Sequence, residues 1–158
     1  MKKAFLNWLD KIGRKRIVMD RQHNEPYLER YYLFLKDRQK FPFNIFLHHF
    51  LKGDPDDVHD HPWNYCTIIV KGGYWEWLPQ FNSQGQKIGE LSVWRSPGHF
   101  RFCKAESYHR IELDPDVDCW TIFIPLKQRK EWGFLVKNKW VPNEQYLQSK
   151  YNNNNITS

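Results

Sequence analysis

Gly53-Asp54-Pro55-Asp56-Asp57-Val58-His59-Asp60-His61 is the stretch from which the rest of this chain can be interpreted. A turn containing glycine and proline ends an apolar run, and two histidines follow at a spacing of two residues. Side chains at i and i+2 of an extended strand point to the same face, so His59 and His61 are predicted to project together while Asp60 points away. Two converging neutral imidazoles form half of a site for iron, copper, nickel or zinc. The alternative is a pair of strand-edge histidines that binds no metal.

The composition around this stretch favours a β-rich fold. The 158 residues fit one domain and include 8 Trp, 8 Tyr and 11 Phe, which favour strands. Short aromatic or β-branched runs alternate with turn residues, which is typical of a sandwich or barrel. We expect strands at 27–36, 43–51, 66–70, 74–78, 90–95, 99–103, 108–113 and 119–126. Helical spacing is confined to residues 4–12 and to a second candidate helix at 143–150.

The positive charge is concentrated at the N-terminus. Residues 1–40 carry 11 Lys or Arg against 5 Asp or Glu, which accounts for the whole net charge of +6. We therefore divide the chain into an N-terminal basic helix or arm (1–26), a β-barrel domain (27–147) and a disordered tail (148–158), and interpret residues 13–26 as turn-rich. The basic arm could contact nucleic acid, although a solvated helix face is the simpler interpretation because acids interleave with the bases.

The cellular setting follows from cysteine content and hydropathy. Three cysteines, Cys66, Cys103 and Cys119, show no paired spacing, which favours free thiols in a reducing compartment. No apolar run approaches the 18 residues that a membrane span requires. Asp10 and Lys11 interrupt the apolar start of the chain, so we do not interpret it as a signal peptide. We expect a cytoplasmic protein without a membrane partner.

A useful metal site needs a third ligand, and His109 is the best candidate. It begins a predicted strand after the Pro97-Gly98 turn, and it lies far enough from His61 for the chain to leave one sheet and return beside it. At this point the sequence resembles a known family. Gly53, His59, His61 and Gly72 resemble the first motif of the cupins, and Pro97-Gly98 followed by His109 resembles the second. The resemblance covers roughly residues 31–126 and implies a small all-β jelly-roll barrel with its metal inside.

One departure from the cupin pattern narrows the resemblance. Cupins usually place a glutamate four or five positions after the second histidine, where this chain has Tyr65 and Cys66. The remaining ligand set resembles that of the three-histidine, cysteine-dioxygenase branch. Three neutral imidazoles leave the charge of Fe(II) uncompensated, which favours an anionic or thiol substrate. The carboxylate-binding arginine of that branch would fall at Leu33, so Arg30, Lys36 or Arg110 would have to replace it, and cysteine itself is a poor candidate for the substrate.

Other residues near the histidines are candidates for the pocket or for contacts behind the ligands. These are Trp63, Tyr65, Cys66, His48 and Arg110. Cys66 could equally be a small buried residue without a function, and His48 could serve core packing or a hydrogen bond. Along its whole length the chain most resembles small single-domain cupin-like proteins with His-Asp-His-Pro-Trp, Gly-Gly-Tyr and a late Trp-Gly-Phe, a resemblance that implies no particular reaction.

The sequence thus predicts a mononuclear metal-binding cupin with His59, His61 and His109 as ligands. Fe(II) is the expected metal, with Zn, Ni or Mn as alternatives, and the expected reaction is a dioxygenation of a small anionic or thiol substrate. Two other functions stay open: a non-catalytic module that holds a small ligand in the barrel, and a structural or nucleic-acid-associated protein that uses its basic N-terminus. A homodimer is a further possibility. No phosphate-binding glycine loop or nucleophile elbow is present, which argues against phosphoryl transfer and serine hydrolysis.

Overall fold

A computed structural model describes residues 3–20, 23–36, 41–54 and 57–154 of the chain. The chain begins with helix α1 (Lys3–Lys11) and closes with helix α2 (Asn143–Asn154). Between them lie the strands β1 (Lys15–Met19), β2 (Pro26–Tyr32), β3 (Phe46–Phe50), β4 (Trp63–Lys71), β5 (Tyr74–Phe81), β6 (Lys87–Arg95), β7 (Phe100–Cys103), β8 (Arg110–Glu112), β9 (Cys119–Gln128), β10 (Gly133–Val136) and β11 (Lys139–Pro142). The expected all-β class is confirmed, and each predicted strand except the segment with His59 and His61 corresponds to one of these elements.

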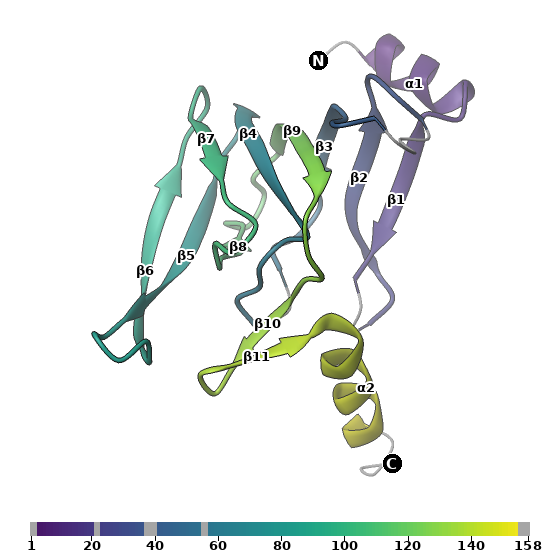
Figure 1. Cartoon of the computed structure of the whole chain (residues 1–158). Coiled ribbons are helices and arrows are strands. Elements are labelled where there is room, and N and C mark those ends of the chain that lie inside the picture. Colours follow the sequence, from purple (N-terminus) through teal and green to yellow (C-terminus); the bar gives the residue numbers. More distant parts are fainter. Residues whose placement is uncertain (1–2, 21–22, 37–40, 55–56, 155–158) are drawn as a thin grey trace.

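Two antiparallel sheets face each other and enclose the barrel interior (Figure 1). In the described part of the chain, one sheet has six strands in the order β1-β2-β3-β9-β4-β7, and the other has three in the order β6-β5-β8. Strands that are distant in sequence are neighbours, because β9 pairs with both β3 and β4. This crossed order agrees with the expected jelly-roll arrangement, in which the chain returns repeatedly from one sheet to the other.

The six-stranded sheet presents a row of polar side chains to the barrel interior. Arg30 pairs with His48 across β2 and β3, His48 pairs with Thr121 of β9, and Thr121 pairs with Ile69 of β4. His48 and Thr121 are buried. Buried polar groups need partners, so a polar row inside an apolar barrel indicates hydrogen bonding or ligand binding at this level.

The N-terminal segment, which the sequence predicted to be a basic helix or arm, packs against the barrel and adds a strand to it. Helix α1 confirms the helix expected at residues 4–12, and Leu9 packs with Tyr31, Leu47 and Trp120 on the outer side of the large sheet. The turn-rich interpretation of residues 13–26 is wrong in part, because β1 pairs with β2 as an edge strand. Lysine and arginine residues are common on edge strands, where they discourage further pairing, and here they obscured the strand signal.

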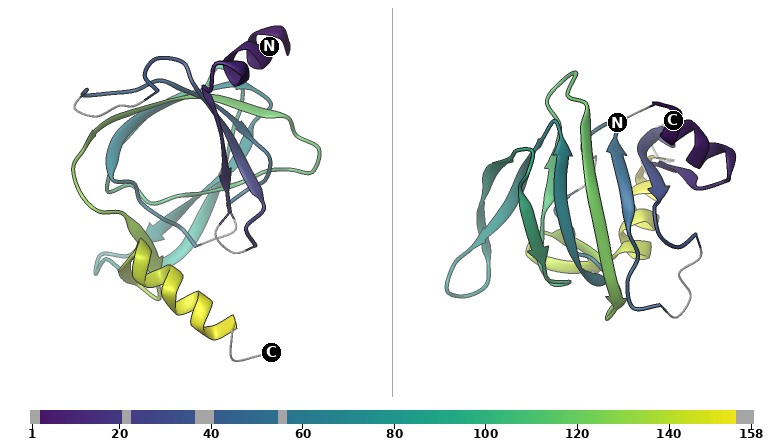
Figure 2. Two further views of the ribbon diagram at one scale, coloured as in Figure 1. Left: turned by 90° about the vertical axis from the view of Figure 1, so that its right-hand side faces the viewer. Right: turned by 90° about the horizontal axis from the view of Figure 1, so that it is seen from above.

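The C-terminal segment covers the opposite end of the molecule from α1 (Figure 2). Residues 133–142 form the hairpin β10–β11, and α2 packs on it through Tyr146, whose ring stacks on Phe134 with centroids 3.9 Å apart. The tail expected to be disordered over 148–158 is helical as far as Asn154, and residues 155–158 lie outside the described residues. Neither α1 nor α2 is long and apolar enough to cross a membrane, and the same holds for every described helical segment.

Gly133 lies where β10 and β11 approach each other too closely for a side chain. A Cβ at this position would overlap the carbonyl oxygen of Val141 and lie 2.9 Å from Cε2 of Trp140. We therefore expect Gly133→Ala to lower the free energy of unfolding by about 1–3 kcal/mol, measured by urea denaturation. Gly89→Ala is the matched control, because its Cβ would find its nearest neighbour 3.6 Å away. Equal stabilities of the two variants would contradict this account of the hairpin.

Candidate metal centre

Backbone hydrogen bonds bring the histidine stretch of the sequence against two distant segments. His59 and His109 form an antiparallel bridge in which each N–H donates to the other carbonyl, at 2.9 and 3.0 Å. On its other side, His59 forms a bridge with Phe134, and Asp60 N–H donates to Gly133 O at 3.0 Å. The segment is extended but pairs only through these isolated bridges, so the expected strand geometry holds without a regular strand.

Asp60 fixes the direction in which the two neighbouring histidines point. It is buried, and its carboxylate accepts hydrogen bonds from Gly133 N at 2.7 Å and Trp140 Nε1 at 3.0 Å. Lys130 also contacts this carboxylate. Because Asp60 is held against the β10–β11 hairpin, the alternation of side chains turns His59 and His61 the other way. The prediction that Asp60 points away from the histidines is confirmed.

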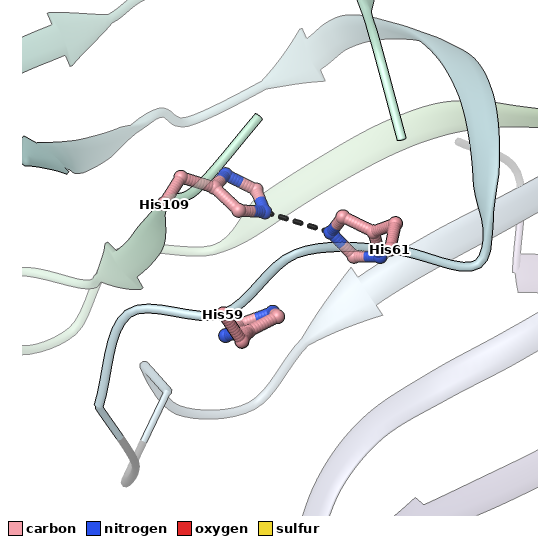
Figure 3. A group of neighbouring side chains, drawn as sticks. All are labelled: His59, His61 and His109. Carbon is pink, nitrogen blue, oxygen red and sulfur yellow. Dashed lines mark hydrogen bonds between the residues drawn. The ribbon is translucent and has the colours of Figure 1, made fainter. Parts of the chain in front are cut away.

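The three imidazoles predicted as ligands converge on one space (Figure 3). Their ring centroids form a nearly equilateral triangle, with 5.2 Å from His59 to His61, 5.2 Å from His59 to His109, and 5.1 Å from His61 to His109. One nitrogen of each ring lies within 4.8 Å of one nitrogen of the other two.

This geometry and donor set fit a metal ion. The Nε2 atoms of His61 and His109 are 2.8 Å apart. Two imidazole nitrogens that bind one ion at right angles, each about 2.1 Å from it, lie about 3 Å apart. Neutral imidazole suits Fe, Zn, Cu and Ni, and no described carboxylate belongs to the group.

Glu76 on β5, which the sequence analysis missed, orients His109. Its Oε1 lies 2.8 Å from His109 Nδ1, so the carboxylate holds the proton on Nδ1 and leaves Nε2 directed toward the other rings. Burial opposes ionisation of Glu76, but the hydrogen bond from His109, the charge of Arg101 and the hydrogen bond from Arg95 outweigh it and lower the pKa of Glu76 to about 2. Glu76 is therefore an anion at neutral pH. A charged residue inside an aromatic strand was the available signal.

His61 and Tyr65 are held in uncharged forms. Burial, followed by the charges of His109, His59 and Lys130, lowers the pKa of His61 well below its usual value. A neutral imidazole is the form that binds a metal. Burial also raises the pKa of Tyr65 well above its usual value, and its hydroxyl lies 3.4 Å from His109 Nε2. The phenol is thus a neutral hydrogen-bonding group beside the three imidazoles.

The three histidines line a cavity of about 320 Å³ inside the barrel. Its walls are largely aromatic and aliphatic, and they include Tyr27, Phe50, Trp63, Tyr74, Ile111, Phe123, Trp132 and Phe134. Asp54 is the carboxylate among the described lining residues, and it accepts hydrogen bonds from Tyr27 Oη and from Ile111 N at 2.6 Å. A cavity of this size with a few polar groups fits a small organic molecule.

Arg30 places a cation in the cavity wall. Its Nε donates to His48 Nε2 at 3.0 Å, and its guanidinium lies 4.8 Å from the centroid of the Phe46 ring. Burial, followed by the charge of Arg30, lowers the pKa of His48 well below its usual value, so His48 accepts this bond as a neutral ring. Among the described residues, no carboxylate forms an ion pair with Arg30. Burial lowers the pKa of Arg30, although a guanidinium still stays charged at neutral pH.

The other residues predicted for the pocket fall into two groups, because side chains alternate between the two faces of a strand. Trp63, Tyr65 and His48 line the cavity as expected. Cys66 does not, because it lies between Tyr65 and Thr67, which both face inward, so its own side chain is on the outer face. Arg110 likewise follows the inward-facing His109, and its guanidinium lies over the Trp77 ring at 4.7 Å on the outer face of the small sheet. Neither Cys66 nor Arg110, both candidates for the pocket or for contacts behind the ligands, is therefore part of the cavity wall.

A second group of possible ligand atoms occurs outside the barrel interior. It consists of Asp20, His23 and Glu25, of which Asp20 is buried and the other two are exposed. Lys52 forms ion pairs with both carboxylates of this group. The ammonium group of Lys52 already supplies the positive charge that a metal would bring. We therefore do not assign a metal site to Asp20, His23 and Glu25.

Comparison with solved structures supports the fold. The polyketide cyclase RemF from Streptomyces resistomycificus is similar with a TM-score of 0.58 and 16% identity, over 87% of this chain and 89% of the cyclase. Hydroxypropylphosphonic acid epoxidase (HppE) from S. wedmorenis has a TM-score of 0.51 and 12% identity, over 72% of this chain and 56% of the epoxidase, and the Fe(II) form of HppE gives the same score. A cupin-like protein from Thermotoga maritima has a TM-score of 0.49 and 14% identity, over 77% of this chain and 83% of that protein.

These comparisons concern architecture alone, because the identities are low. No family model and no curated protein matches the chain. The strand order and the similarity to the cyclase and to HppE nevertheless show an antiparallel β-barrel fold, which is the architecture that the resemblance of the motifs implies. The chain spans little more than half the length of HppE, so that enzyme's chemistry is not transferred with the fold.

The role of Glu76 can be tested through metal affinity. Glu76→Gln keeps the shape of the side chain but removes the charge that fixes His109, so we expect Co(II) to bind 10–100-fold more weakly, measured by competition with a chelator. Arg95 and Arg101 lose their counter-charge, so the variant should also be less stable. Glu112→Gln on β8 is the control and should bind Co(II) normally, because Glu112 is exposed. An unchanged affinity in Glu76→Gln would exclude this role.

Proposed function

We propose that this protein binds one Fe(II) ion through His59, His61 and His109 and catalyses the dioxygenation of a small anionic substrate, with thiol carboxylates as the leading class. The observation that carries the proposal is the triangle of imidazoles on the wall of a small-molecule cavity. Three neutral ligands leave the charge of a divalent ion uncompensated, which favours an anionic partner. The Fe(II) form of HppE shares the fold, which supports the choice of metal.

Each part of the cavity has a role in this proposal. When bound, the metal would supply a Lewis-acidic, redox-active centre with coordination positions that the imidazoles do not fill. Glu76 holds the proton on His109 Nδ1, and the Tyr65 hydroxyl can donate a hydrogen bond to a ligand beside the imidazoles. The aromatic walls exclude water around them, which strengthens these polar contacts.

Arg30 is the residue that would bind the anionic group of the substrate. A guanidinium presents several N–H donors in a fork that matches a carboxylate. Nε of Arg30 donates to His48 and the side chain also forms a hydrogen bond with Tyr32, which leaves further N–H donors for a substrate. The Phe123 ring separates this region from the histidines, with centroids 5.0 Å from His48 and 6.5 Å from His61. A substrate would therefore extend from Arg30 past Phe123 toward the three imidazoles.

Metal binding by the three histidines is tested with single substitutions. The purified protein should bind one equivalent of Fe(II) or Co(II), and His59→Ala, His61→Ala and His109→Ala should each weaken binding at least 100-fold, because each removes one of three ligands. His99→Ala, in the turn before β7, serves as the control and should bind normally. Stoichiometric metal retained by all three variants would contradict the assignment.

Oxygen consumption with a matched pair of thiols tests the reaction and the role of Arg30. The Fe(II)-loaded protein should consume oxygen with 3-mercaptopropionate, and Arg30→Gln should raise KM for this acid about 10–100-fold, the loss expected for a hydrogen bond to a charged group. The neutral 3-mercaptopropionamide should react poorly with the normal protein and be unaffected by the substitution. Binding of the acid without oxygen uptake would instead support a non-catalytic ligand-binding module.

A further inference from the structure

Helix α1 has apolar side chains on two of its flanks. Leu9 and Leu6 pack on the large sheet, as expected of a surface helix. Phe5 and Trp8 of α1 and Ile12, the residue directly after the helix, have spacings of three and four residues. They form a second stripe that remains 42%, 53% and 43% exposed. The Phe5 and Trp8 rings stack with centroids 6.0 Å apart. A helix at the surface of a soluble protein normally presents polar residues on the flanks that its own core does not cover, so this stripe requires an explanation.

A second group of exposed apolar side chains adjoins this helix. It follows β2 and consists of Leu33, Phe34 and Phe41, which are 36%, 39% and 42% exposed. Arg14, in the turn after α1, donates to the carbonyl oxygens of Tyr32 and Phe34 at 3.1 Å, so the two groups lie at the same end of the molecule (Figure 1). We refer to Phe5, Trp8, Ile12, Leu33, Phe34 and Phe41 together as the aromatic end.

The segments that form the aromatic end also carry cations without neutralising partners. Lys3, Lys11 and Lys36 are exposed, and Arg14 is half-buried. None of these four forms an ion pair with a described carboxylate, whereas Lys15 nearby is neutralised by Glu29. The first 40 residues carry the whole net charge of +6. This end of the molecule is therefore both apolar and positively charged, and its partner should be apolar and negatively charged.

Although the sequence alone predicted no membrane partner, we propose that the aromatic end docks on the surface of an anionic phospholipid bilayer. Aromatic side chains on a short helix insert at the boundary between headgroups and acyl chains, while lysines and arginines at the same level pair with anionic headgroups. The surface binds from one side, since no described helix is long enough to cross the bilayer. This inference is independent of the metal centre, which lies inside the barrel.

A lipid surface fits these observations better than a nucleic acid does. The exposed stripe is made of a phenylalanine and a tryptophan on α1 and of the isoleucine that directly follows it. Binding to a phosphate backbone depends on the cations and gains little from burying such a stripe. A bilayer interface uses both features, because its headgroup region is charged and its acyl region is apolar.

Flotation of the full chain with vesicles tests the proposal. The protein should float with phosphatidylcholine vesicles containing 30% phosphatidylglycerol and not with phosphatidylcholine alone. Trp8→Ser should weaken the association roughly 10-fold because it removes apolar burial. Lys11→Gln should weaken it roughly five-fold, as expected for one cation near an anionic surface. Phe100→Ser is the matched control, because Phe100 on β7 is 58% exposed but lies away from the aromatic end, and this variant should float normally.

Several results would overturn the proposal. These are an absence of flotation with the anionic vesicles, equal losses in Trp8→Ser and Phe100→Ser, and a Trp8-dependent dimer in lipid-free solution. Binding to duplex DNA that Lys11→Gln weakens and Trp8→Ser leaves unchanged would also overturn it, in favour of a nucleic-acid surface. Because the Trp8 side chain is largely exposed, the melting temperature of the variant should match that of the normal protein. If it does not, Phe5→Ser tests the same stripe and should give the same loss of flotation.

Discussion

The reciprocal backbone hydrogen bonds between His59 and His109 are the constraint on which the site depends. They join two residues that are 50 positions apart in sequence and fix their side chains at one level of the barrel wall. A single antiparallel bridge of this kind would be weak alone, but His59 is also bridged to Phe134 on its other side. The histidine segment is therefore held between the segments that contain His109 and Phe134. The imidazoles converge because these backbone contacts already bring their residues together.

The C-terminal segment supports this arrangement from outside the barrel. Asp60 accepts hydrogen bonds from Gly133 and Trp140, and Tyr146 of α2 donates to Asp57 at 2.8 Å while stacking on Phe134. Both contacts act on residues within two positions of His59. The late Trp-Gly-Phe motif is thus explained by close packing at Gly133 and by aromatic contacts of Trp132 and Phe134 with the His59 ring, at 6.0 and 5.8 Å. The motif holds the histidines in place through packing, and this explanation assigns it no catalytic role.

Local patterns in the sequence predicted the strands and the three converging histidines, because i and i+2 spacing and turn residues act over a few positions. Glu76 escaped detection because its partners, His109, Arg95 and Arg101, are brought to it by sheet pairing. The available local signal was that Glu76 is a charged residue inside an aromatic strand. Cys66 and Arg110 were placed wrongly for a simpler reason: each is the immediate strand neighbour of a residue that faces inward, so alternation excludes it. Strand β1 was missed because its charged residues obscure an edge strand.

The cavity brings a cation and the three imidazoles to two ends of one space. Arg30 carries an uncompensated charge near one end, and three imidazoles, with Glu76 behind His109, converge near the other. A buried charge opposes folding unless it is paired, so the guanidinium of Arg30 points to an anionic ligand in the cavity.

The central claim is that the three imidazoles bind one cation, and anomalous diffraction from crystals grown with Co(II) tests it most directly. The account predicts a single strong peak in the barrel, about 2.1 Å from a ring nitrogen of His59, His61 and His109. A barrel without a peak, or a peak only at Asp20, His23 and Glu25, would contradict it.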